Sequence, residues 1–186
     1  MNAELYSPEN APADSVAMLS GIQEKMGGML PNLYRQMAGA PAVLEAYLDL
    51  SDLLGKSSFS PAEQQLILLT ASARNGCVYC VAAHSSGARM AKLDKSAIEA
   101  VRDGAEIEDG KLQALRAYVE EVMETRGKVT DAGMQAFQDA GYTQTQAMEA
   151  MIGISMKALS NNFSRMFSTP LDGFLEKMKW DGNDRV

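Results

Sequence analysis

Both cysteines and the only histidine of this 186-residue chain lie within eight consecutive positions. The segment reads CVYCVAAH, with Cys77 and Cys80 three residues apart and His84 four residues beyond the second cysteine. If the segment is helical, 100° per residue places the three side chains within about 60° of one another on one face. A thiolate beside an imidazole is the arrangement expected of a reactive cysteine, because the thiolate is the form that attacks electrophiles.

The residues before the first cysteine predict where this helix begins. Asn75 and Gly76 are expected to end a preceding apolar helix, so both cysteines fall in the first turn of the new one. Unpaired backbone N–H groups and the helix dipole favour an anion there by about 0.3–1 kcal/mol. The position therefore favours thiolate over thiol.

Other chemistry is compatible with two cysteines and one histidine. A structural zinc site needs four ligands, so it would have to borrow a carboxylate or a ligand from another subunit. Covalent haem attachment is excluded, because it needs histidine directly after the second cysteine, where Val81 stands. A thioredoxin fold places C-x-x-C after a strand, whereas an apolar helix is expected here. Two inert, buried cysteines and a hydrogen-bonded histidine are the plainest alternative.

The composition of the chain limits the classes of partner. The net charge is −7, and no run of Lys or Arg forms a stripe that neutralises phosphates, so we expect no nucleic-acid partner. The N-terminal segment lacks the basic flank and apolar core of a secretory signal, and no stretch approaches the roughly 18 apolar residues of a membrane span. We therefore expect a cytoplasmic protein without a membrane partner. In a reducing cytosol a cysteine pair is more often catalytic, redox-sensing or metal-binding than a permanent bridge.

Apolar residues recur at helical spacing along most of the chain, and no alternating strand pattern of useful length is present. The expected fold is therefore all-α, a compact multi-helix bundle of roughly eight to ten helices. We expect residues 1–13 to form an extended arm, Asp14 to cap the first helix, and residues 14–186 to form a single domain. The sequence SPAE at residues 60–63 has the form of a capping box with proline at the first helical position. Later helices are expected at 41–54, 61–74, 77–91, 94–101, 111–125, 130–140 and 143–167.

Residues 60–90 resemble the core motif of the alkyl hydroperoxidase D (AhpD) and carboxymuconolactone decarboxylase superfamily. They read SPAEQQLILLTASARNGCVYCVAAHSSGARM, and the family pattern is E-x(11)-C-x-x-C-x-x-x-H. Two further segments, MLPNLYRQMAGAPAVLEAYLDL and NNFSRMFSTPLDGFL, are similar to the family's lead-in helices and its C-terminal segment. The resemblance extends over about residues 20–178 and is strongest to the peroxidase-related branch.

The resemblance implies a helical homo-oligomer, often a trimer or hexamer, that reduces hydroperoxides without haem, flavin or another cofactor. Cys80 matches the peroxidatic cysteine, which becomes a sulfenic acid, and Cys77 matches the residue that resolves it to a disulfide. An external dithiol, lipoyl or thioredoxin-like, then reduces that disulfide. His84 matches the histidine of the family's proton relay.

The chain departs from the family at the relay carboxylate. Twelve residues before Cys77 the family has glutamate, and this chain has Gln65, whose neutral amide cannot accept and return a proton. Glu63 is nearby, but two positions on a helix are about 200° apart, and the capping box already explains this residue. Tyr79, between the cysteines, is expected either to donate a phenol hydrogen bond or to pack. Loss of the carboxylate is expected to slow proton delivery by a factor of order 10² without removing thiol–disulfide chemistry.

Two other functions compete with a thiol-dependent peroxidase. A lactone decarboxylase is the other activity that the superfamily name implies, but the resemblance places that activity in a branch without the two-cysteine motif. A non-catalytic, redox-sensing oligomer is the second alternative, in which Gln65 records a lost activity.

Overall fold

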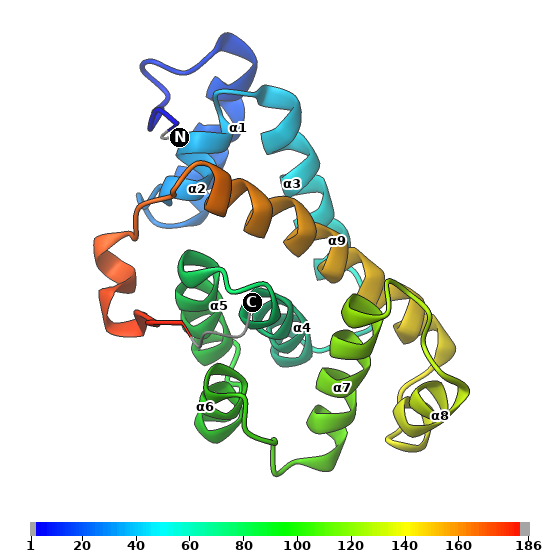
Figure 1. Ribbon diagram of the computed structural model, residues 1–186. Helices are drawn as coiled ribbons and strands as arrows, with labels where there is room; N and C mark the ends of the chain where they lie inside the picture. Colours follow the sequence, from blue (N-terminus) through cyan, green and yellow to red (C-terminus); the bar gives the residue numbers. More distant parts are fainter. Residues whose placement is uncertain (1–2, 183–186) are drawn as a thin grey trace.

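The computed structural model describes residues 3–182, and every regular element within that range is a helix (Figure 1). The all-α prediction is confirmed. The elements are α1 Ala13–Lys25, α2 Asn32–Met37, α3 Pro41–Gly55, α4 Pro61–Arg74, α5 Val78–Met90, α6 Lys95–Asp103, α7 Gly110–Glu124, α8 Asp131–Asp139, α9 Gln144–Met166 and the 3₁₀ helix η1 Gly173–Met178.

Helix α4 lies at the centre and packs against α5, α7 and α9. Its sequence explains this place, because Leu66, Ile67 and Leu69 are fully buried and Leu68 is nearly so, which leaves no polar stripe for solvent. Burying each such side chain contributes about 1.5–3 kcal/mol before the entropy of ordering is counted. The predicted SPAE capping box starts the helix, with Ser60 and Glu63 bonded reciprocally. The sequence thus specifies both where the central helix begins and why it is buried.

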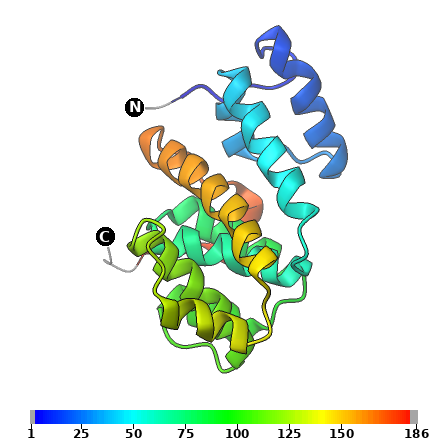
Figure 2. The same ribbon diagram turned by 90° about the vertical axis from the view of Figure 1, so that its right-hand side faces the viewer.

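Two apolar clusters lie on either side of this central layer. One joins α4 to α6, α7 and α8, and the other joins α1, α2 and α3 to α5, α9 and η1. Figure 2 shows α1–α3 at one end of the molecule and α6–α8 at the other, with α9 running alongside α3. The cysteines belong to the second cluster. The functional motif is therefore placed where the N-terminal helices meet the centre of the bundle.

The N-terminal segment differs from one expectation. Helix α1 begins at Ala13, so Asp14 lies in its first turn and does not cap it. Residues 3–12 form no helix and lie against α2: the Tyr6 N–H donates to the Arg35 carbonyl oxygen over 3.2 Å, and Arg35 Nε donates back to the Tyr6 carbonyl oxygen over 3.0 Å. These bonds hold the arm against α2 of the same chain.

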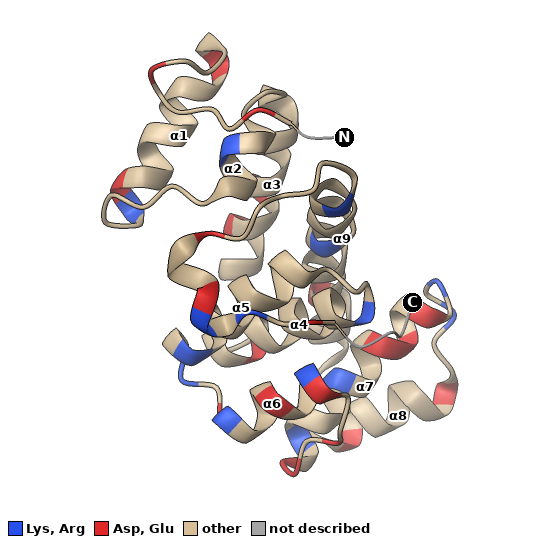
Figure 3. Ribbon diagram, turned by 60° about the vertical axis from the view of Figure 1, so that its left-hand side comes forward, with Lys and Arg blue, Asp and Glu red and all other residues tan. Residues whose placement is uncertain are grey.

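The C-terminal segment also docks on the bundle. Trp180 is buried, and its Nε1–H donates to the Arg102 carbonyl oxygen over 3.1 Å. In the part of the chain that the structure describes, no helix combines the length and apolarity that crossing a bilayer requires. Lys and Arg are interspersed with Asp and Glu over the helices in Figure 3, without a continuous basic stripe on the face shown.

Candidate active site

A tight connection between α4 and α5 positions the two cysteines. Gly76 has a φ of 63°, in the left-handed region that favours glycine, and the Cys77 N–H donates back to the Ser72 carbonyl oxygen over 3.0 Å. Cys77 is then the N-cap of α5, where its sulfur accepts a hydrogen bond from the Cys80 N–H over 3.3 Å. The prediction that Asn75-Gly76 separates two helices is confirmed, and both sulfurs lie at a helix start that favours negative charge.

The sulfurs of Cys77 and Cys80 lie at disulfide distance, with Cα atoms 5.3 Å apart. Both residues are only 1% exposed, so neither sulfur is open to bulk solvent. Cys80, however, contributes to the wall of a cavity of about 440 Å³. An external reactant thus has a route to the second cysteine of the pair.

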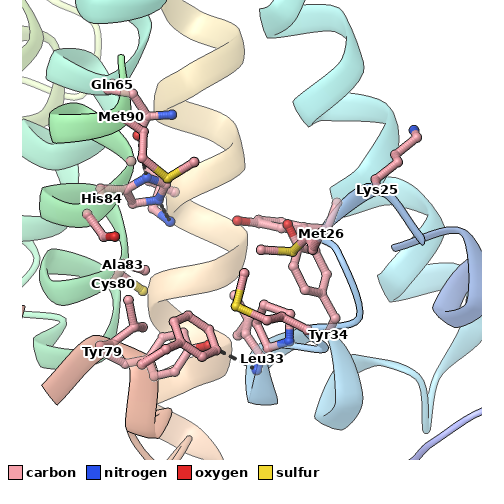
Figure 4. A pocket seen from close by; sticks show the side chains of 18 residues that line it. Lys25, Met26, Leu33, Tyr34, Gln65, Tyr79, Cys80, Ala83, His84 and Met90 are labelled. Carbon is pink, nitrogen blue, oxygen red and sulfur yellow. Dashed lines mark hydrogen bonds between the residues drawn. The ribbon is translucent and has the colours of Figure 1, made fainter. Parts of the chain in front are cut away.

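The cavity lies between the N-terminal helices and α5, as Figure 4 shows. Its wall is mainly apolar and aromatic, and its mouth carries exposed Met29, Met90 and Phe174. Cys80 and His84, one turn apart on α5, both face it (Figure 4). Other residues of the wall are Met26, Pro31, Leu33, Tyr34, Tyr47, Gln65, Tyr79, Cys80, Ala83, His84, Lys157 and Leu175.

Two side chains from other helices bond the ring nitrogens of His84. Nδ1 lies 3.1 Å from Gln65 Oε1 on α4, and Nε2 lies 2.8 Å from Lys157 Nζ on α9. An amide oxygen only accepts, so Nδ1 carries the proton and Nε2 offers its lone pair to the lysine. The residue at the position of the family's carboxylate therefore contacts the histidine, but as a neutral acceptor that fixes its tautomer.

Gly87 makes room for this contact. A Cβ at this position would lie 2.6 Å from Gln65 Oε1, closer than real Cβ contacts allow. The absence of a side chain one turn beyond His84 therefore lets the Gln65 amide lie against α5. Three residues that the sequence placed in one motif, Gln65, His84 and Cys80, are brought to one cavity.

Lys157 is a site residue that the motif at residues 60–90 does not contain. It is fully buried, and this removal from water lowers the pKa of its ammonium to about 7. Burial and then the nearby lysine charge hold the pKa of His84 well below its ordinary value. The signal was present in the pattern of α9, because Gly153, Ser160 and Ser164 lie four, three and seven residues from Lys157 and are all buried. A lysine on that face has to point into the protein.

Tyr79 and Glu63 have structural partners. The Tyr79 hydroxyl donates to Asp172 Oδ2 over 2.7 Å and accepts from the Leu33 N–H, so it ties α5 to α2 and to the segment before η1. Glu63 forms the capping box and a 3.4 Å ion pair with Lys111, away from the cavity wall. Within residues 3–182, no three His, Cys, Asp or Glu side chains converge as a metal site would require.

Comparison with known proteins finds one matching family and several structures with the same fold. Residues 41–121 match the carboxymuconolactone decarboxylase family. No curated protein matches the chain in sequence. An uncharacterized peroxidase-related protein from Ralstonia eutropha JMP134, described as an alkylhydroperoxidase AhpD core, superposes with a TM-score of 0.83 at 22% identity, over 94% of this chain and 93% of its own.

Two further structures share the fold over nearly the whole chain. A peroxidase-related protein from Silicibacter sp. TM1040 has a TM-score of 0.78 at 18% identity, covering 94% of this chain and 92% of its own. A cysteine-to-alanine variant of the debrominase Bmp8, in complex with 2,3,4-tribromopyrrole, has a TM-score of 0.75 at 15% identity, covering 96% of each chain. The family match is therefore confined to residues 41–121, whereas the fold shared with these AhpD-like structures extends over nearly the whole chain.

Proposed function

We propose that this protein is a thiol-dependent peroxidase that reduces organic hydroperoxides through Cys77 and Cys80. One observation carries the proposal: Cys80, paired with Cys77, lines an apolar cavity together with the proton-handling groups of His84 and Lys157. The nucleophile and the proton carriers thus lie around one space that an organic molecule can enter, and the resolving thiol lies next to the nucleophile.

The reaction follows from the order of these groups. The Cys80 thiolate attacks one oxygen of ROOH, the O–O bond breaks, and sulfenic acid and ROH result. The Cys77 thiol then attacks the Cys80 sulfur, which forms the disulfide and releases water. An external dithiol, lipoyl or thioredoxin-like, restores both thiols by exchange. Hydroperoxide is reduced by two electrons, and the dithiol is oxidised by two.

The cavity wall favours an apolar substituent on the peroxide. Methionine, leucine and tyrosine side chains form most of the surface, and a volume of about 440 Å³ suits a small organic molecule. We therefore expect cumene hydroperoxide to react faster than hydrogen peroxide, because only the former buries apolar surface.

Peroxide consumption with dihydrolipoamide as reductant tests the proposal. Cys80→Ser is expected to lower turnover by roughly 10²-fold or more, since it removes the nucleophile. Cys77→Ser is expected to stop turnover but to leave one round of peroxide reduction, with sulfenic acid trapped on Cys80. Turnover that survives in Cys80→Ser contradicts the assignment. A disulfide that forms with oxidant while no peroxide is turned over supports the redox-sensing alternative instead.

Reductive dehalogenation of a small aromatic compound is a second candidate. The observation that favours it is the ring of Tyr34, Tyr47 and Tyr79 around the Cys80 cavity, in a fold shared with a debrominase seen with 2,3,4-tribromopyrrole. The balance is Ar–Br plus a dithiol giving Ar–H, HBr and a disulfide, so the same cysteine pair supplies both electrons. Bromide release from a bromopyrrole, measured beside peroxide consumption, decides between the two substrates.

A further inference from the structure

Lys157 presents a buried amine to the cavity that Cys80 lines. Its Nζ lies 2.8 Å from His84 Nε2 and 6.0 Å from the centre of the Tyr47 ring. Within residues 3–182 it forms no ion pair with a carboxylate. An ammonium has three N–H donors, and the histidine takes one. A buried donor without a second acceptor is costly, so the remaining N–H groups point to an acceptor on a molecule that enters the cavity.

We propose that Lys157 is the proton donor of this site: its ammonium binds the leaving oxygen of the hydroperoxide and protonates it while Cys80 attacks the other oxygen. This inference rests on the peroxidase function proposed above. It assigns to α9 the acid–base role that the family pattern gives to a carboxylate on α4.

The spacing of Cys80 and His84 along α5 is compatible with a nucleophile at Cys80 and a proton donor at Lys157. His84, which holds Lys157, is four residues beyond Cys80, a rise of about 6 Å along the helix axis. A peroxide oxygen poised about 3–3.5 Å from the attacking sulfur, with the second oxygen about 3 Å from a nitrogen donor, spans a comparable length. Since Cys80, His84 and Lys157 line the same cavity, we expect the O–O group to lie between the sulfur and the amine, with the organic group in the apolar part of the cavity.

The charges around Lys157 leave it as the proton carrier near neutral pH. Besides Lys157, the titratable groups that line the cavity are Tyr79, Cys80 and His84 from α5, Tyr47 from α3, Tyr34 from α2 and Lys25 from α1, while α4 contributes only the neutral Gln65. Burial raises the pKa of all three tyrosines, and the pKa of His84 lies well below its usual range. Burial brings the pKa of Lys157 to about 7, so it can both give and take a proton at that pH.

The proton balance closes over one cycle. Cys80 thiolate, ROOH and the Lys157 ammonium give Cys80 sulfenic acid, ROH and neutral Lys157. Cys77 thiol and the sulfenic acid then give the disulfide and water. When the external dithiol reduces this disulfide to two thiols, neutral Lys157 takes the Cys80 proton, which restores the thiolate and the ammonium together.

Lys157→Met tests the proposal, with Lys157→Arg as the charge-retaining variant and Lys95→Met, at an exposed position, as the matched control. The pre-reduced proteins are mixed with cumene hydroperoxide in a single turnover from pH 5 to 9. Lys157→Met is expected to react about 10²-fold more slowly at pH 7 and to lose the pH dependence centred near 7. Lys157→Arg keeps the cation but does not release a proton, so it also loses that dependence. Lys95→Met is expected to keep the wild-type profile.

A wild-type pH profile in Lys157→Met overturns the inference. Alkylation of Cys80 by iodoacetamide, followed by mass spectrometry, separates this result from failure of the proposed function because it needs no peroxide. If the wild-type protein does not react with hydroperoxides, the peroxidase proposal is wrong. An alkylation midpoint that Lys157→Met moves to higher pH then still supports Lys157 as the proton partner of Cys80, and an unmoved midpoint overturns it.

Discussion

Arg116 and Lys157 are both buried cations, but the chain holds them in different ways. Arg116, on α7, donates to Glu120 over 3.0 Å and to the carbonyl oxygens of Ala100 and Ala105. The void beside it is only about 30 Å³. Lys157, on α9, has the imidazole of His84 as its hydrogen-bond partner and borders a cavity of about 440 Å³.

The difference separates a cation that stabilises the fold from one retained for chemistry. A buried charge is tolerated when a counter-charge and carbonyl oxygens replace its water, as around Arg116. The surroundings of Lys157 provide no such replacement, so its charged form is disfavoured and its pKa falls to about 7. Replacing the cation by methionine is therefore expected to lower the free energy of unfolding at Arg116 and to raise it at Lys157.

Arg116→Met is expected to have the largest effect on stability. It removes the donor that faces Glu120 and two backbone carbonyl oxygens, and it should lower the free energy of unfolding by about 3 kcal/mol. Urea unfolding followed by circular dichroism measures this value. Arg116→Lys keeps the charge but not the planar guanidinium, so its free energy of unfolding should lie between those of Arg116→Met and the wild type. A gain in stability for Arg116→Met would show that Arg116, like Lys157, does not stabilise the fold.

Lys157→Met is expected to raise the free energy of unfolding by about 2 kcal/mol at pH 6, because methionine fills a similar volume without a buried charge. This gain in stability is expected to fall as the pH rises. Below pH 7 the lysine is charged in both states and its burial is fully unfavourable. Between the folded pKa of about 7 and the ordinary value of 10.5 the folded chain binds fewer protons than the unfolded one, so wild-type stability rises with pH.

The advantage of Lys157→Met over the wild type should therefore shrink toward zero above pH 10.5. Denaturation of the oxidised proteins between pH 6 and 10 measures it, since the cysteines do not titrate in the disulfide. A stability loss at pH 6 would mean that Lys157 is a structural cation like Arg116.

The sequence predicted the fold and the α4–α5 turn well, because both depend on local signals. Apolar periodicity, the SPAE capping box and Asn75-Gly76 act within a few residues, and α4 and α5 appear where these signals place them. Lys157 was missed because its partner, His84, lies 73 residues earlier in the chain. The Tyr79 hydroxyl bond to Asp172 spans 93 residues. Such pairs depend on how helices dock, which periodicity alone does not specify.

Gln65→Glu is expected to give Lys157, through His84, the counter-charge that it lacks and that Arg116 has in Glu120. A carboxylate at Nδ1–H stabilises the protonated forms of both His84 and Lys157, so the midpoint of the pH profile for Cys80 oxidation should rise by about one unit. Gln144→Glu adds the same charge at an exposed position of α9 and should leave the midpoint unchanged. A midpoint that stays near 7 in Gln65→Glu would show that the amide does not act on the lysine through the histidine.

Tyr79→Phe has the smallest expected effect, and it tests whether Tyr79 is a structural contact or part of the proton pathway. The variant loses the bond to Asp172 and leaves the Leu33 N–H without its acceptor, which should lower the free energy of unfolding by about 1 kcal/mol. Asp172 keeps the hydrogen bonds from the Asn32 N–H, so the loss stays small. The pH midpoint for Cys80 oxidation should not move, since burial and the neighbouring Asp172 raise the pKa of Tyr79 far above the range in which the site works. If the pH midpoint for Cys80 oxidation shifted while the free energy of unfolding stayed unchanged, Tyr79 would belong to the proton pathway with Lys157. It would then not be a purely structural contact.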